Sequence, residues 1–140
     1  MQQVVPQFRF TSTRLATRFR MHYAEQGAPG GEVLICLHGY ADSWYSYSRL
    51  LPLLPAHYHT YALSQRGHGD SERPINGYTV NDLAADVTAF MDAVSVPSAT
   101  IVGDSSGAII ARRVAESHPE RVARLVLIAA PIRIPVNEAT

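Results

Sequence analysis

One five-residue segment of the chain has the residue types and the spacing needed for nucleophilic catalysis. Residues 103–107 read Gly-Asp-Ser-Ser-Gly, with Ser105 at the centre and a glycine two positions away on either side. In a tight G-x-S-x-G turn between a strand and a helix, the serine hydroxyl can attack a carbonyl carbon, and the flanking positions have no room for side chains. We therefore expect Ser105 to be a catalytic nucleophile and Gly103 and Gly107 to shape the turn that presents it.

The residues on either side of this segment favour that geometry. The apolar run Ala99–Val102 precedes it, and Ile109, Ile110 and Val114 follow it at helical spacing. Such a pattern predicts a buried strand followed by a helix, so Ser105 would lie at the carboxyl end of the strand and face the free amides of the helix. The alternative interpretation is a Gly- and Ser-rich turn that only caps the helix.

A second segment, His38-Gly39-Tyr40, follows the apolar run Val33–Leu37. Acyl transfer needs at least two N–H donors aimed at the developing oxyanion. The backbone amide of Ser106 is the expected first donor, and the backbone amide of Tyr40 is the candidate for the second. His38 is expected to hold this loop rather than to act as a base, because it precedes the nucleophile in the chain.

These segments need a framework of alternating strands and helices. The patterns predict an antiparallel hairpin within residues 8–23, later strands at 33–37, 58–63, 99–102 and 125–129, and three helices. The helices are a short one through Tyr47–Leu54, one capped by Thr79 and Asp82 that ends before Pro97, and one from about Gly107 to His118. The alternation predicts an α/β fold with a mostly parallel sheet and flanking helices.

Four stretches, taken in order, resemble the N-terminal half of an α/β-hydrolase of the epoxide hydrolase, haloalkane dehalogenase and esterase branch. They are Leu37–Trp44, Gln65–Ser71, Gly103–Gly107, and His118–Val122 ahead of Leu125–Ile128. The resemblance implies that residues 1–140 are the N-terminal portion of a single α/β-hydrolase domain. That portion would end after about the sixth strand, with no complete second domain.

Two departures from the family pattern bear on function. The tight turn of residues 103–107 corresponds to the family's nucleophile elbow. The epoxide hydrolases and dehalogenases that this chain resembles carry Asp at its centre, where this chain has Ser105. The resemblance therefore implies acyl chemistry on a small-molecule ester or similar substrate, as in esterases, lactonases or carbon–carbon bond hydrolases, rather than an alkyl-enzyme mechanism. The family often has Pro after the oxyanion residue, where this chain has Ala41.

The general base is missing from the expected place. In this family the acid and then the histidine follow the nucleophile, but only His118 follows Ser105, and Glu138 is a weak candidate for the acid. His118 would lie at the far end of the elbow helix, roughly 16 Å from the hydroxyl. We therefore expect little or no turnover by this chain alone. The alternatives are a non-catalytic binding module of the same fold, or one half of a two-chain enzyme that self-associates or docks its partner at the apolar edge strand.

Two further clusters contain residues that could belong to a site. The segment Arg66–Ser71 contains His68, but the resemblance assigns this segment to a structural turn, and Gly67 and Gly69 fit that role. The aromatic residues Trp44, Tyr45 and Tyr47 could either line an apolar pocket or belong to the core.

Composition and charge exclude several classes of protein. Of the 140 residues, 46% are hydrophobic. Twelve acidic and twelve basic residues give a net charge of zero, and every basic residue is an arginine, scattered along the chain. This pattern gives no basic surface for nucleic acid.

Neither G-x-G-x-x-G nor a phosphate-loop lysine is present, and the histidines lack metal-ligand spacing, so no cofactor and no metal are expected. No run approaches the roughly 20 apolar residues of a membrane span, and the single cysteine, Cys36, excludes an internal disulfide. We expect a soluble, cytoplasmic chain.

Overall fold

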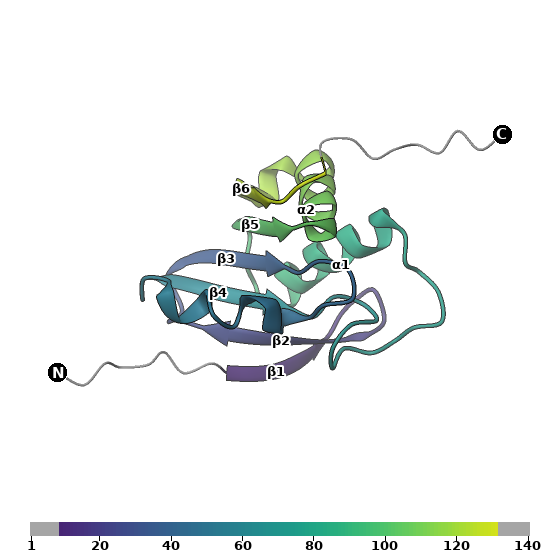
Figure 1. The fold of residues 1–140 in the computed structure, drawn as a ribbon, viewed down its shortest axis with the longest axis horizontal. Helices are drawn as coiled ribbons and strands as arrows, with labels where there is room; N and C mark the ends of the chain where they lie inside the picture. Colours follow the sequence, from purple (N-terminus) through teal and green to yellow (C-terminus); the bar gives the residue numbers. More distant parts are fainter. Residues whose placement is uncertain (1–8, 132–140) are drawn as a thin grey trace.

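The computed structural model describes residues 9–131 and arranges them around one six-stranded sheet (Figure 1). The strand order is β1-β2-β4-β3-β5-β6, with β3 parallel to β4 and β5, β5 parallel to β6, and β1 and β2 antiparallel to their neighbours. The strands are β1 (Arg9–Arg14), β2 (Arg20–Gln26), β3 (Glu32–Leu37), β4 (Tyr58–Leu63), β5 (Ala99–Asp104) and β6 (Val122–Ile128). The predicted α/β fold with a mostly parallel sheet is confirmed.

Helices α1 (Val80–Ala93) and α2 (Ser106–Ser117) pack together on one face of the sheet, over the larger core cluster. The cap of α1 is the predicted one: Thr79 Oγ1 accepts a hydrogen bond from the Asp82 amide, and the Thr79 amide donates to the Asp82 carboxylate. This capping box fixes where α1 begins, because it satisfies two backbone groups that have no partner within the helix.

The opposite face carries two 3-10 turns, η1 (Trp44–Tyr47) and η2 (Leu51–Leu53), and a third turn, η3 (Pro119–Arg121), precedes β6. The prediction of a single helix through Tyr47–Leu54 is therefore wrong. Pro52 explains the difference, because proline has no N–H for an i→i−4 bond and its ring clashes with the preceding turn. Tyr47 and Leu51 still bury their side chains against this face, in a second cluster with Cys36 and Val102.

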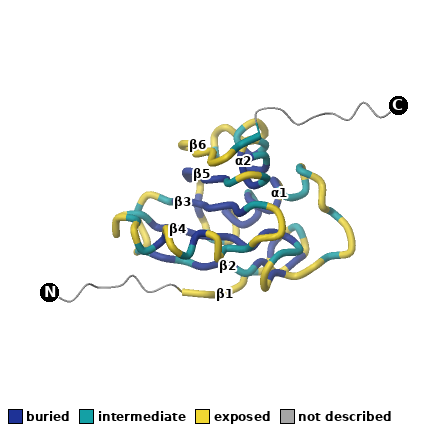
Figure 2. Tube along the Cα trace, viewed as in Figure 1, coloured by how far each residue is buried: buried dark blue, intermediate teal, exposed yellow. Residues whose placement is uncertain are grey.

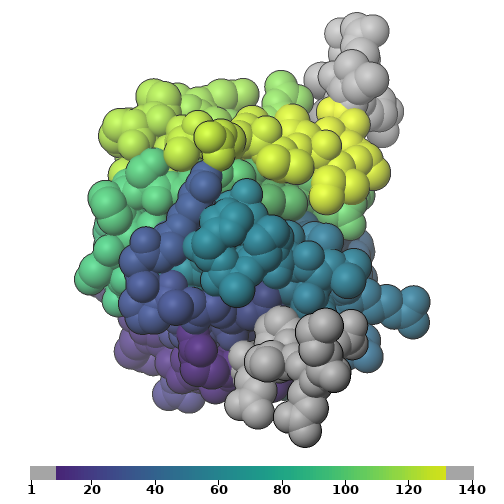
Figure 3. Space-filling view, turned by 90° about the vertical axis from the view of Figure 1, so that its left-hand side faces the viewer, coloured from purple at the N-terminus to yellow at the C-terminus, as the bar shows by residue number. Residues whose placement is uncertain are grey.

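The strands differ in how well they are covered (Figure 2). Almost every residue of β3, β4 and β5 is buried or half-buried, as expected for strands packed on both faces. β6 lies at the edge of the sheet, and its residues 125–128 are each 36–43% exposed. It forms part of the upper border of the surface in Figure 3. The predicted apolar edge is therefore present.

Two smaller findings complete the fold. Cys36 is buried in β3, and burial raises the pKa of its thiol to about 12, so the residue behaves as a small apolar side chain. Among the described helices, none combines the length and the apolar character that crossing a bilayer requires.

Candidate active site

Ser105 lies at the junction between β5 and α2 in a backbone conformation that L-residues rarely adopt. Its φ is +54° and its ψ is −118°, and the residue is exposed. A non-glycine residue in such a region costs of order 1–3 kcal/mol and persists only where the surroundings impose it. The sharp turn that the sequence predicts is therefore present, and it holds the serine side chain at the surface.

The two flanking glycines allow this turn because a side chain at either position would collide with backbone. A Cβ on Gly103 would meet the Gly107 carbonyl oxygen and lie 2.7 Å from the Ala108 Cα. A Cβ on Gly107 would meet the Leu37 carbonyl oxygen and lie 2.6 Å from the His38 carbonyl oxygen. Helix α2 thus packs directly against the end of β3, which brings the loop after β3 to Ser105.

Backbone hydrogen bonds hold Ser105 from both sides. Its amide donates to the Ile128 carbonyl oxygen at the end of β6, at 2.9 Å, and its carbonyl oxygen accepts from the Ala108 amide at 3.0 Å. The edge strand β6 therefore supports the strained residue, in addition to completing the sheet.

The loop after β3 lies against Ser105. A Cβ on Gly39 would lie 3.4 Å from the Ser105 Cβ and 4.0 Å from its Oγ. The next residue, Tyr40, is 86% exposed, and its amide has no hydrogen-bond partner within residues 9–131. Ser106 is the first residue of α2, where the amide has no partner within the helix. Both candidate oxyanion donors are thus free at this end of the sheet.

Ala41 gives this loop its shape in the place where the family often has proline. The turn closes by a 3.3 Å hydrogen bond from the Asp42 amide to the Gly39 carbonyl oxygen, and Ala41, at its third position, has φ +62°. A positive φ at that position is typical of a type II turn. The Ala41 amide donates to His68 Nε2 at 3.3 Å, a contact that proline has no N–H to make.

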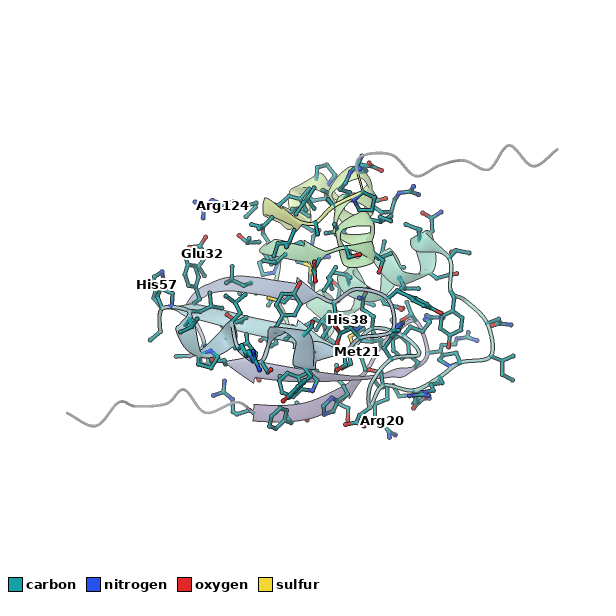
Figure 4. The ribbon with its side chains drawn as sticks, in the orientation of Figure 1. Arg20, Met21, Glu32, His38, His57 and Arg124 are labelled. Carbon is teal, nitrogen blue, oxygen red and sulfur yellow. The ribbon has the colours of Figure 1, made fainter. Side chains whose placement is uncertain are left out.

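His38, labelled in Figure 4, directly follows β3. It is fully buried and both of its ring nitrogens make hydrogen bonds. Nδ1 donates to the Gly39 carbonyl oxygen at 2.7 Å, and Nε2 accepts from the Gln65 amide at 2.9 Å. The Gln65 side chain also donates to the His38 carbonyl oxygen at 2.8 Å. Burial lowers the pKa of His38, so the ring is held neutral in this network. These contacts agree with a structural role for His38.

His68 belongs to the turn that follows β4 and is also held by backbone. Its Nδ1 donates to the Arg66 carbonyl oxygen at 2.9 Å, and its Nε2 accepts from the Ala41 amide. The turn is anchored below by Arg66, whose guanidinium makes two hydrogen bonds to the buried Asp86 carboxylate, at 2.8 and 3.0 Å. The segment Arg66–Ser71 is therefore a structural turn, as the sequence indicates, and it also supports the loop after β3.

The structure brings no further histidine to Ser105. All six histidines lie among the described residues. His57 and His59 are at the amino end of β4, opposite the elbow (Figure 4). His22 lies on β2, three strands from β5 and thus about 14 Å away. His118 follows the twelve-residue helix α2, about 18 Å from its start. The carboxylate candidate Glu138 lies outside the described residues.

The candidate oxyanion loop is the segment His38-Gly39-Tyr40, and the aromatic residues after it divide between two roles. Tyr47 is buried and its hydroxyl donates to the Leu37 carbonyl oxygen at 2.8 Å, so it is a core residue that fixes the end of β3. Trp44 packs against the same cluster, and Tyr45 is 68% exposed. Sequence patterns gave no signal for the Tyr47 contact or for the contacts of Gln65, because both depend on pairings between distant segments.

A cavity of about 150 Å³ lies beside the oxyanion loop. Tyr40 and Ser106 line it together with residues from the starts of α1 and α2. Within residues 9–131, no three His, Cys, Asp or Glu side chains are grouped so that they could hold a metal ion.

This fold and this elbow are those of the α/β-hydrolases, and the chain belongs to that family: the family description "alpha/beta hydrolase fold" matches residues 32–139. The resemblance inferred from the sequence is confirmed. Epoxide hydrolase A of Mycobacterium tuberculosis is 36% identical over 115 residues, which cover 80% of this chain and 36% of that protein.

Solved structures of other proteins share this fold. Cfl2 from Burkholderia cenocepacia has a TM-score of 0.85 and 28% identity, covering 99% of this chain and 49% of that one. A membrane phospholipase A described as a bacterial virulence factor has a TM-score of 0.87 and 30% identity, covering 94% of this chain and 42% of that one. The chain spans about a third of the length of the curated relatives that it matches.

Proposed function

We propose that this chain carries the nucleophile and the oxyanion loop of a serine hydrolase that cleaves esters or related acyl compounds. The observation that supports this most strongly is the conformation of Ser105, strained at φ +54° and exposed at the start of α2. The loop of Gly39 lies against it, and two free amides are nearby. Strain of this kind gathers at functional sites, where it positions a reactive group.

In the proposed reaction, Ser105 Oγ attacks the acyl carbonyl carbon. A C–O bond forms, the carbonyl electron pair moves onto oxygen, and the amides of Tyr40 and Ser106 stabilise the oxyanion. Collapse of this intermediate breaks the bond to the leaving group, which takes the proton that Ser105 released. Water then hydrolyses the acyl-enzyme and regenerates the serine.

The relatives' names do not transfer to this chain, because the nucleophile decides what can turn over. A carboxylate that opens an epoxide forms an ester, and water can cleave that ester at its carbonyl. A serine hydroxyl that opens an epoxide forms an ether, which has no carbonyl for water to attack. With Ser105 at the elbow, acyl substrates are the class that completes a catalytic cycle.

The proton acceptor must come from elsewhere, because none of the six histidines offers a free ring nitrogen beside Ser105. We place residues 1–140 as one portion of a single hydrolase domain, with the base supplied by a further part of the protein or by a second chain. The 140-residue chain alone is then expected to have no Ser105-dependent turnover.

The experiment is p-nitrophenyl butyrate hydrolysis by the 140-residue chain alone and by the full gene product, which here means this chain together with the further part or second chain that supplies the base. Ser105→Ala should lower kcat of the full product by at least about a thousandfold. Ser106→Ala keeps the backbone amide and should change kcat by less than about threefold, because the amide, not the side chain, stabilises the oxyanion. The 140-residue chain should match its own Ser105→Ala variant. Equal rates for the full product and its Ser105→Ala variant would refute the proposal.

The exposed apolar edge supports a second candidate, a binding module of the same fold. Within residues 9–131, no element covers residues 125–128 of β6, and unpaired apolar edges of this kind associate with other chains. In this case β6 pairs with a second copy or with a complementing chain, whether or not Ser105 is catalytic.

A further inference from the structure

The cavity beside the oxyanion loop has walls suited to an apolar guest. It lies where the starts of α1 and α2 meet the loop after β3, and its apolar lining comes from both helices. The side chains involved are Val80 and Leu83 of α1 and Ile109 and Ile110 of α2.

The polar residues at the wall do not offer a site for a charged ligand. The ring nitrogens of His38 and His68 and the side-chain nitrogen of Gln65 all make hydrogen bonds to backbone or accept them from it. Among the described residues no arginine lines the cavity and its walls are mainly apolar, so it favours neutral ligands over carboxylates.

The position of the cavity connects it with the reaction proposed above. Tyr40 and Ser106, whose amides are the oxyanion donors, both line it. Gly39 also lines it, and a Cβ added to Gly39 would lie 4.0 Å from Ser105 Oγ. A carbonyl oxygen held by the two amides therefore places a substituent of the carbonyl carbon at the cavity mouth.

The volume sets the size of that substituent. An apolar protein cavity of about 150 Å³ accommodates a six-carbon guest such as benzene, and this cavity is about 150 Å³. We propose that it is the acyl-binding subsite of the enzyme and that it takes a neutral, apolar acyl group of up to about six carbons. The inference rests on the proposed function for its catalytic part, and on the cavity itself for its binding part.

The binding part is tested on the 140-residue chain carrying Ser105→Ala, with benzene as the probe. Methyl NMR should show saturable shifts of Val80, Leu83, Ile109 and Ile110 that disappear when Leu83→Phe fills the cavity. The matched control is Ile75→Phe at a fully exposed position, which should leave the shifts in place. If Leu83→Phe does not fold, Ile109→Phe replaces it. Absence of saturable shifts at these methyls overturns the inference.

The catalytic part is tested on the full gene product with p-nitrophenyl esters from acetate to dodecanoate. The value of kcat/KM should peak at butyrate to hexanoate and fall at least about tenfold by decanoate. Leu83→Phe should move the peak to acetate, and Ile75→Phe should not. Ser105-dependent turnover without this dependence on chain length also overturns the inference. Benzene binding without any Ser105-dependent turnover refutes the proposed function and leaves a ligand cavity.

Discussion

At the scale of single residues, the strained backbone of Ser105 fixes the position of one hydroxyl and lowers the stability of the chain. Ser105 adopts φ +54° and ψ −118°, a conformation that is strained for serine and less so for glycine. Ser105→Gly should therefore raise the free energy of unfolding by about 1 kcal/mol and remove the hydroxyl that we propose as the nucleophile.

Urea unfolding measures this change, and Ser106→Gly is the matched control. Ser106 is the first residue of α2, so glycine there should lower the free energy of unfolding by about 1 kcal/mol or less. If both substitutions destabilise the chain equally, Ser105 is not strained.

The buried His38 makes stability depend on pH. Burial is the largest cause that lowers its pKa, and nearby His68 lowers it too, while the hydrogen bond to Gly39 and the charge of Asp42 act in the opposite direction. The unfolded chain therefore binds a proton between the ordinary pKa of about 6.5 and the lower folded value. In that window the free energy of unfolding falls as pH falls.

Urea titrations from pH 7.5 to 5 measure this dependence. His38→Gln should flatten the slope below about pH 6.5. His57→Gln, a change at an exposed histidine, should leave it unchanged. A slope that persists in His38→Gln would assign the pH dependence to other groups.

At the scale of elements, the contact between α2 and β3 decides whether the site assembles. Gly107→Ala forces a Cβ into the Leu37 and His38 carbonyl oxygens and should lower the free energy of unfolding by about 3 kcal/mol. Gly39→Ala is the matched control. Its Cβ makes ordinary contacts at 3.4 Å and beyond, so the cost should stay below about 1 kcal/mol.

Thermal or urea denaturation of the two variants compares these costs directly. Equal stability of Gly107→Ala and Gly39→Ala would show that α2 can shift away from β3, and the close approach would not be a requirement of the fold.

The same elements show what a sequence can predict. The capping box of Thr79 and the elbow around Ser105 depend on residues a few positions apart, so local pattern finds them. The spacing of the leucines predicts one helix where the structure has the turns η1 and η2, because apolar periodicity does not register that Pro52 interrupts helical hydrogen bonding. The bonds from Gln65 to His38 and from Ser105 to Ile128 join segments 27 and 23 residues apart. Local periodicity carries no information on such pairs.

At the scale of the whole molecule, we expect the edge strand β6 to decide whether the chain associates. Val126 of β6 is 43% exposed and its strand neighbours are similarly uncovered. We expect the chain to self-associate through β6, and Val126→Lys should shift it toward monomer, because a charge on an edge strand opposes pairing.

Size-exclusion chromatography with light scattering measures the shift, with Leu53→Lys on the exposed turn η2 as the control. A monodisperse monomer in the unsubstituted chain would contradict self-association through this edge.

The central claim is that Ser105 is the reactive nucleophile of a hydrolase, and covalent labelling tests it most directly. The full gene product is incubated with a fluorophosphonate, digested, and analysed by mass spectrometry that localises the adduct. We expect one phosphonyl group on Ser105, none on Ser106, and no adduct in the Ser105→Ala variant. An adduct on another residue, or no adduct in a folded and complete protein, would contradict the account.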